Sequence, residues 1–262
     1  MTAAELGSAL FAEVLKARRS RVPSITVLVV MAFPAAAALF IFIVADPQRA
    51  MDLGILGQKA QISGMTADWP GLLMFATQAA AVASLLLHSF IVTWIFGREF
   101  VDGTAHGLMA LPVSRAAVVS AKYVLYAAWA ILLGLWLTTL TFVVGLLMRL
   151  PGWSAESAAG TAAEMVQATV ATVLAITPVA YVASRARGYL APLACALGLL
   201  ALAQVAVILG WGAYLPWAIP ALAAGIDPAQ GATGVSWLIV VTTGLLGVRA
   251  TIRWWRGPDA GL

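Results

Sequence analysis

The chain has 262 residues, of which 62% are apolar and only 10% are charged. Soluble domains carry about 25% charged residues, so this composition excludes an ordinary soluble protein. About 20 apolar residues cross a bilayer, so the length allows roughly five to eight membrane-spanning helices. The net charge is +4. The chain has one cysteine and two histidines, too few for a disulfide framework or for a metal site built from cysteine or histidine.

We expect residues 5–21 to form an amphipathic helix. Basic residues crowd its second half, and Pro23 ends it. We expect it to lie in the cytoplasmic membrane interface and to lead into the first span, because basic side chains favour anionic lipid. A short frayed leader is the alternative. The apolar residues that recur at helical spacing are Leu6, Leu10, Phe11, Val14 and Leu15.

Six charge-free apolar stretches follow, and each is an expected span. The last becomes long enough if its helix begins near Gly231, because backbone polar groups in lipid must be paired within a helix. Pro34 and Pro178 lie inside two spans and are expected to kink them. The predicted fold is an all-α membrane protein in which residues 1–262 form one transmembrane domain. The stretches cover residues 24–45, 71–96, 123–148, 165–183, 189–210 and 235–248.

Basic residues are distributed unevenly between the loops. If the N-terminus is cytoplasmic, only Arg49, Lys59 and Arg149 of the 15 basic residues lie outside. This positive-inside pattern predicts an even number of spans with both termini in the cytoplasm. One re-entrant stretch, giving five or seven spans, is the alternative.

Residues 211–234 separate the fifth and sixth spans and are apolar but interrupted by three prolines. Non-helical backbone survives at membrane depth only where protein buries it or where it lines a cavity. We therefore expect short re-entrant helices in the outer leaflet, with Trp211, Tyr214 and Trp217 at the interface. A plain external loop is the alternative.

The loop between the second and third spans, residues 97–122, carries the most distinctive pattern. Asp102 or Thr104 can cap a helix of about two turns, Pro112 ends it, and Ser114 can cap the next helix. The apolar side chains of the short helix would then lie at the water edge, where apolar groups rimmed by charge commonly mark a docking site. The alternative is that the charges of the loop anchor two helix ends at the lipid headgroups.

This loop resembles the signature of type-2 ABC exporter permeases. The matching order is Arg98-Glu99, then Asp102-Gly103-Thr104, a short apolar helix, Pro112-Val113-Ser114-Arg115 and Lys122. The chain is similar to the six-span permeases of bacitracin and lantibiotic self-protection transporters, and the similarity extends to the N-terminal helix and to the external segment 214–220. In that family the loop forms a coupling helix that fits a groove in a separate ATP-binding subunit. The docking residues that the resemblance implies are Arg98, Glu99, Asp102, Gly103, Thr104, His106, Leu108, Met109, Pro112, Ser114, Arg115 and Lys122.

The resemblance implies the permease subunit of an ATP-binding-cassette exporter in the bacterial cell membrane. Its partners would be two ABC ATPase subunits and a second permease, either a copy of this chain or a paralogue. The chain contains no Gly-x-x-x-x-Gly-Lys-[Ser/Thr] loop, so ATP and magnesium are expected on the ATPase. We expect no cofactor, metal or catalytic residue in this chain, and no nucleic-acid partner.

The interior of the expected spans carries no Asp, Glu, Lys or Arg, which disfavours a proton-coupled carrier. The polar residues inside the spans are uncharged, and a transport path lined by such residues suits an amphipathic or hydrophobic cargo such as a peptide antibiotic, a lipid-like molecule or a drug. Ordinary hydrogen bonding between helices is the alternative role of these polar groups. The candidate residues of a substrate path are Gln78, His88, Thr138, Thr141, Thr177 and Gln204.

Two other functions remain open from the residues. A membrane-embedded enzyme acting on a lipid or isoprenoid would need acidic or histidine clusters near the interface, and Glu99 with Asp102 is the only close acidic pair in the loop. A membrane anchor or assembly factor that transports nothing would lack any such signature.

Overall fold

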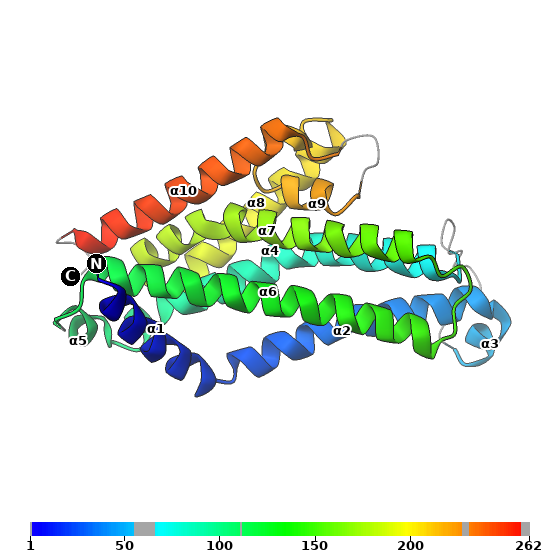
Figure 1. The fold of residues 1–262 in the computed structure, drawn as a ribbon, viewed down its shortest axis with the longest axis horizontal. Coiled ribbons are helices and arrows are strands. Elements are labelled where there is room, and N and C mark those ends of the chain that lie inside the picture. The colour runs from blue at the N-terminus through cyan, green and yellow to red at the C-terminus, as the bar shows by residue number, and fades with distance from the viewer. Residues whose placement is uncertain (1, 55–65, 111, 227–230, 258–262) are drawn as a thin grey trace.

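The computed structural model describes residues 2–54, 66–110, 112–226 and 231–257, and these form helices joined by turns and short irregular segments, with no strand. The helices run side by side along one long axis (Figure 1). Six of the described helices are long and apolar enough to cross a membrane, which confirms the predicted all-α membrane fold. They are α2 (Val22–Ala45), α4 (Trp69–Val101), α6 (Arg115–Leu147), α7 (Ala155–Ala186), α8 (Leu190–Ile208) and α10 (Gly234–Arg256).

Several helices extend well beyond the apolar stretches. The helices α4 and α6 each have 33 residues, which at 1.5 Å per residue is about 50 Å, against roughly 30 Å of hydrocarbon. A charge ends an apolar stretch but does not end a helix, which continues until a capping residue. Ser114 caps α6 and Ser154 caps α7, in each case by accepting a backbone N–H with the side chain. The sixth span begins at Gly234, after the cap Thr233 and close to the start of its apolar stretch, and it reaches 23 residues because it continues to Arg256.

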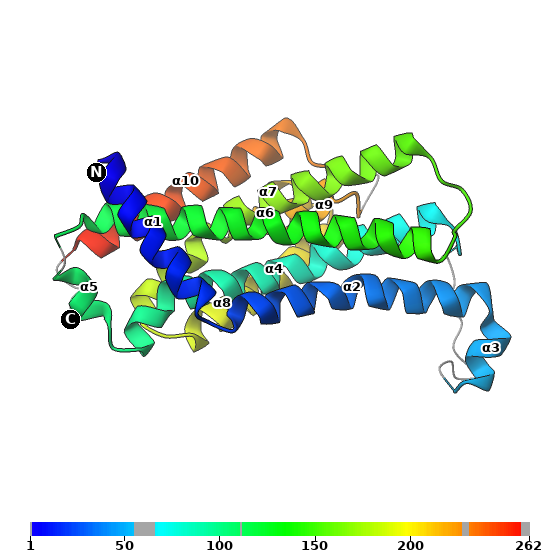
Figure 2. The ribbon, with the colours of Figure 1, turned by 60° about the horizontal axis from the view of Figure 1, so that its bottom comes forward.

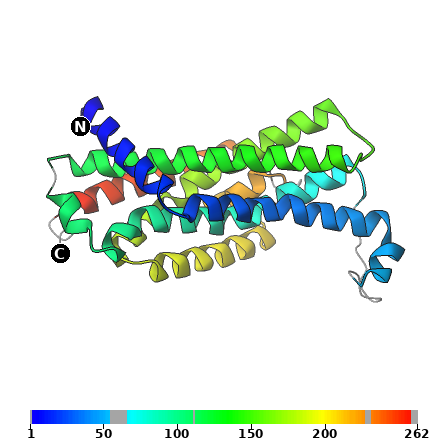
Figure 3. The ribbon, with the colours of Figure 1, turned by 90° about the horizontal axis from the view of Figure 1, so that it is seen from below.

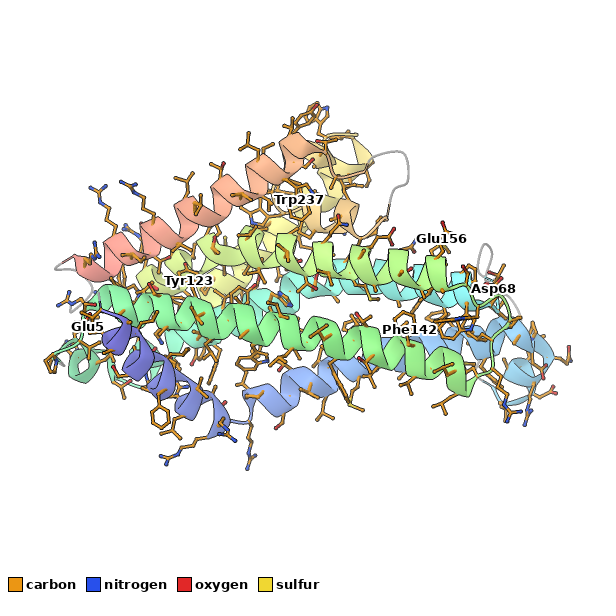
Figure 4. The ribbon with its side chains drawn as sticks, in the orientation of Figure 1. Glu5, Asp68, Tyr123, Phe142, Glu156 and Trp237 are labelled. Carbon is orange, nitrogen blue, oxygen red and sulfur yellow. The ribbon has the colours of Figure 1, made fainter. Side chains whose placement is uncertain are left out.

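The two ends of the bundle differ in what they carry. The short helices α1 (Ala3–Arg18) and α5 (Ala105–Met109) lie at one end together with the end of α10, and α3 (Pro47–Asp52) lies at the other (Figures 2 and 3). We call these the α5 end and the α3 end. Glu5 lies at the α5 end, whereas Asp68 lies near the α3 end (Figure 4). The first and last described helices therefore meet at one end, as an even number of crossings requires.

The helix α7 packs against both α4 and α10, and the main core forms around these contacts. Close approach of α10 depends on Gly247, where an added Cβ would lie 2.7 Å from the backbone nitrogen of Pro178. The helices α2 and α7 both continue through their internal prolines, Pro34 and Pro178. At the α3 end, Trp69 packs on Gly145 in a smaller cluster.

The segment between α8 and α10 folds back onto α7. It forms the turn η1 (Gly212–Tyr214) and the helix α9 (Ile219–Ala223), as short helices were expected. The Trp217 indole donates a hydrogen bond to the carbonyl of Ala175, just past the middle of α7, at 3.0 Å. Trp211 and Tyr214 are exposed, whereas Trp217 is half-buried and turned toward α7. The segment therefore packs against α7 away from the ends of that helix, and its position inside or outside the membrane stays a prediction.

Candidate functional site

Four charged side chains from three helices meet inside the α5 end. Glu13 and Lys16 come from α1, Glu99 from α4 and Lys122 from α6. We call these four residues the charge cluster. The Lys122 ammonium lies 2.8 Å from Glu99 Oε1 and 3.1 Å from Glu13 Oε2, and it also donates to the carbonyl of Ile95 at 2.8 Å.

Lys16 closes the charge cluster from its outer side. Its ammonium lies 2.6 Å from Glu13 Oε1 and 2.9 Å from Glu99 Oε1. Burial would lower the pKa of Lys16, but the attraction of Glu99 and then of Glu13 outweighs it, and the pKa is raised above its ordinary value of 10.5. Two carboxylates and two ammonium groups give the cluster no net charge, so it is stable inside the protein only as a set.

Three of the four members of the charge cluster are almost completely buried, whereas the Lys16 side chain is 30% exposed. Glu13 is 3% exposed, Glu99 1% and Lys122 0%. The second oxygen of Glu99, Oε2, is buried and has no hydrogen-bond partner among the described residues. Removal of one member from a buried ion pair costs about 3–5 kcal/mol, because the opposite charge is left uncompensated. The cluster therefore holds α1 firmly against α4 and α6.

The helix α1 presents an unexpected face to the bundle. Its buried residues are Ala9, Glu13 and Ala17, spaced four apart on one face, whereas Phe11 is 71% exposed and Leu15 is also exposed. Glu13 is not one of the apolar residues that recur at helical spacing in this segment, yet the structure places it inward. The reason is that Lys122 supplies a buried countercharge. The exposed Phe11 and Leu15 leave an apolar face free for the membrane interface.

The loop between α4 and α6 is shorter and more closely packed than predicted. Asp102 is the C-terminal capping residue of α4, and Gly103 follows with φ +68°. Thr104 begins α5 without a side-chain capping bond, and α5 has five residues, where about two turns were expected. Leu108 and Met109 are half-buried against the main core, so they do not form the exposed apolar surface that was predicted.

Side-chain bonds tie this loop to both ends of the chain. The Ser114 hydroxyl caps α6, as predicted, and also donates to Glu5 Oε2 on α1 at 3.3 Å. The Arg115 guanidinium donates to the carbonyls of Trp255 and Gly257 at 3.2 and 3.1 Å, so it caps the C-terminal end of α10. The loop therefore rests on α1, α6 and α10 together.

A second loop also reaches this region. The Tyr189 ring, between α7 and α8, lies against Gly97, where an added Cβ would be 3.1 Å from the ring. Partial burial raises the pKa of Tyr189, and the nearby Asp102 carboxylate raises it further. Arg98 lies 4.7 Å from the centre of the Trp94 ring in a cation–π contact. Arg98 and Tyr189 thus line the outer side of the end of α4.

The predicted docking residues divide into three groups by position. Glu99 and Lys122 lie inside the charge cluster, and Arg98, Leu108, Met109, Ser114 and Arg115 are half-buried. The exposed members form what we call the loop surface, and they are Asp102, Gly103, Thr104, His106 and Pro112. Sequence reasoning missed Glu13 and Lys16, although both stand at the spacing that puts them on one face of α1.

The predicted substrate-path residues are not gathered at one place. Thr138 bonds Gly134 and Met165, Thr177 bonds Leu174 and Gly244, and Thr141 bonds Leu137. Gln78 is half-buried on α4, and Gln204 is exposed on α8. Of the six, His88 alone lines a cavity between α4 and the helices α2, α6 and α7. Thr138 and Thr177 each make one bond to a neighbouring helix, which is the alternative interpretation, whereas their other bonds and the bond of Thr141 go to carbonyls of their own helix.

Two comparisons with known proteins agree with this architecture. Residues 9–203 match the family model described as ABC-2 family transporter protein. The chain is 24% identical over 174 residues to Bacitracin transport permease protein BCRB of Bacillus licheniformis, which covers 66% of this chain and 84% of that protein. The family match runs from α1 into α8 and so contains the whole charge cluster and the loop surface. The chain therefore belongs to the ABC-2 family of transporter proteins and is a multi-pass membrane permease of the kind that associates with ATP-binding subunits.

Proposed function

We propose that this chain is the permease subunit of an exporter and that its loop surface binds a separate ATPase. The observation that carries the proposal is the loop surface itself, which projects from the α5 end while the residues beneath it are bonded to three helices. Because the loop is held rigidly in this way, a movement of the bound partner would be transmitted to α4 and α6 and not absorbed by deformation of the loop. Docking through the exposed residues also leaves the charge cluster intact.

In this proposal Glu99 and Lys122 have a different role from the one that the resemblance implied. Their side chains are 2% and 0% exposed, so a docked partner would not reach them. We assign them to holding α1 against the loop. Direct contact with the ATPase falls to Asp102, Thr104 and His106, with Arg98 and Arg115 at the edge.

The complete transporter in this proposal has two permeases and two ATPases. The second permease is a copy of this chain or a paralogue, and the complex lies in the bacterial plasma membrane with both chain ends in the cytoplasm. ATP and magnesium bind to the ATPase, because the sequence of this chain has no phosphate-binding loop. The cargo is an amphipathic or hydrophobic molecule, and the name of the bacitracin permease to which the chain is similar favours a peptide antibiotic.

Purification of the tagged chain at native expression in mild detergent tests the proposal. We expect an ATPase with a phosphate-binding loop to copurify. His106→Asp should lower its recovery at least tenfold, because a charge without a partner would be desolvated at the contact. His106 suits this test better than Leu108, whose half-buried side chain supports the loop from within.

The matched control is Ala159→Asp, which adds the same charge to an exposed position near the α3 end of α7. It should leave ATPase recovery unchanged. Recovery of the wild-type chain with no nucleotide-binding partner would overturn the proposal. Equal loss of ATPase in both variants would show that the charge acts on folding and not on docking.

A further inference from the structure

The bundle contains a cavity of about 50 Å³ lined mainly by α2, α4, α6 and α7, with Ala224 at the end of α9 as a further lining residue. Four of its fourteen lining residues are polar, and none is Asp, Glu, Lys or Arg. The helix α4 supplies three of these polar residues, Thr77, Ser84 and His88, which recur on one face at spacings of seven and four. The wall of the cavity is therefore mostly apolar, with one row of polar side chains along the face of α4.

His88 is the most distinctive group in this wall. It is 5% exposed, and its Nδ1 lies 3.3 Å from the hydroxyl of Tyr126. No other hydrogen bond joins the ring to any part of the chain that the structure describes. The second ring nitrogen, Nε2, thus has no hydrogen-bond partner among the described residues, and an unpaired polar atom beside a cavity favours a ligand that can hydrogen-bond.

A second hollow lies directly outside the cavity. It is a groove of about 440 Å³ on the outer side of α2 and α4, lined by residues such as Ile25, Val29 and Phe90. Phe33 and Leu87 line both the groove and the inner cavity, so these two side chains form the partition between them. The groove contains no charged side chain, and its walls belong to two membrane-spanning helices.

The partition lies where α2 is locally weakened. Pro34 follows Phe33 and has no N–H, so the carbonyl of Val30 loses its usual helical donor. Val30 also lines the inner cavity. A helix turn that lacks this bond bends more readily than its neighbours, so Phe33 belongs to the more easily deformed part of α2.

We propose that the groove and the cavity together form a binding site for a neutral single-chain amphiphile that enters from the lipid. Its apolar chain lies in the groove, and a hydroxyl or carbonyl at its end passes between Phe33 and Leu87 to bond His88. A charged end group is excluded, because no opposite charge lines either hollow and an unpaired charge at membrane depth is costly. The site lies within one copy of the chain, and the proposal goes beyond export because it concerns binding alone.

Photolabelling of the full chain in phosphatidylcholine nanodiscs, together with its ATPase where the two copurify, tests the site. The probe is a long-chain alcohol with a diazirine near its hydroxyl end, and labelled residues are located by mass spectrometry. We expect saturable labelling of residues that line the cavity, competed by unlabelled hexadecanol and at least tenfold less by hexadecanoate. No ATP is added, so the outcome does not depend on transport or on ATPase docking.

Two variants sharpen the test. Ala168→Phe fills the cavity from α7 and should abolish saturable labelling, whereas Ala163→Phe, at an exposed position of the same helix, should preserve it. His88→Phe should weaken competition by hexadecanol about twofold to tenfold, the range for one lost hydrogen bond. It should leave competition by hexadecane unchanged. If His88→Phe does not fold, the loss of saturable labelling in Ala168→Phe still tests whether the cavity is the binding site.

Labelling that is not saturable and is equal in Ala168→Phe and Ala163→Phe would overturn the proposal. Disulfide formation between two copies that carry Val29→Cys, with loss of labelling, would also overturn it. That result would show that the groove is covered by a second copy and not by lipid.

Discussion

Lys122 on α6 and Glu99 on α4 form an ion pair with a distance of 2.8 Å between Nζ and Oε1, and neither side chain is more than 2% exposed. Glu13 of the N-terminal helix completes the pair at 3.1 Å from the same ammonium. Lys122 and Glu99 belong to the loop charges that could have anchored helix ends at the lipid headgroups, but the structure shows that both stabilise the contact between helices inside the protein. These supports lie on α1 and on α4 and α6, the two helices joined by the loop that we propose binds the ATPase.

Replacement of Lys122 by Met should destabilise the protein by about 3–5 kcal/mol, because Glu13 and Glu99 would remain buried without their shared countercharge. Thermal unfolding of the purified chain, followed by tryptophan fluorescence, measures this loss. The double variant Lys122→Met with Glu99→Gln should regain part of the stability. Arg18→Met, at an exposed position of α1, is the control. A similar loss in Arg18→Met would contradict the assignment.

Replacement of Gly103 by Ala should reduce export more than ATP hydrolysis. Gly103 has φ +68°, and a left-handed conformation costs other residues about 1–2 kcal/mol, although nothing lies within 4 Å of the added Cβ. The loop surface should therefore change shape without a steric clash. Measuring cargo exported per ATP hydrolysed by the complex tests this. Gly107→Ala, in α5 and equally open, should leave the ratio unchanged, and equal effects would be evidence against coupling through this turn.

Replacement of Gly247 by Ala should separate α10 from α7. The added Cβ would lie 2.7 Å from the nitrogen of Pro178 and 2.8 Å from the carbonyl carbon of Thr177, and both atoms are backbone that cannot turn aside. We expect a loss of about 1–3 kcal/mol in stability, the usual range for overpacking. Gly198→Ala on α8, where nothing lies within 4 Å, should unfold at the wild-type temperature or above. Unchanged unfolding of Gly247→Ala would show that this helix contact is looser than described.

Single cysteines in a Cys195→Ala background should report the orientation of the chain. A cysteine at Ala159 should react with an impermeant thiol reagent added outside intact cells, because it is exposed near the α3 end. Cysteines at His106 and Ala186, exposed at the other end, should react only after the membrane is opened. Gly57 and Ala229 are further expected outside positions and Ala260 is a further expected inside position, and all three lie outside the described residues. External labelling at Ala186 would disprove the six-span orientation, since Arg185 and Arg187 are expected to hold that loop inside.

The sequence alone was sufficient to predict the six spans, the family resemblance and the capping of α6 by Ser114. Each depends on local information, because lipid requires every span to be a continuous apolar helix whose backbone bonds lie within itself. The broken segment after α8 was predictable for the same reason, since three prolines cannot sit inside one helix. The ends of the helices were less predictable, because a charge such as Lys122 interrupts an apolar pattern without interrupting the helix.

Only the tertiary structure decided which charges are buried and where the hollows lie. Lys16 and Glu99 are 83 residues apart in sequence, and Glu13 and Lys122 are 109 apart, so no local spacing could pair them. The inward turn of Leu108 and Met109 and the cavity beside His88 likewise depend on several helices meeting. A side chain's partner is set by packing between distant segments, whereas its tendency to sit in a span is set by its neighbours along the chain.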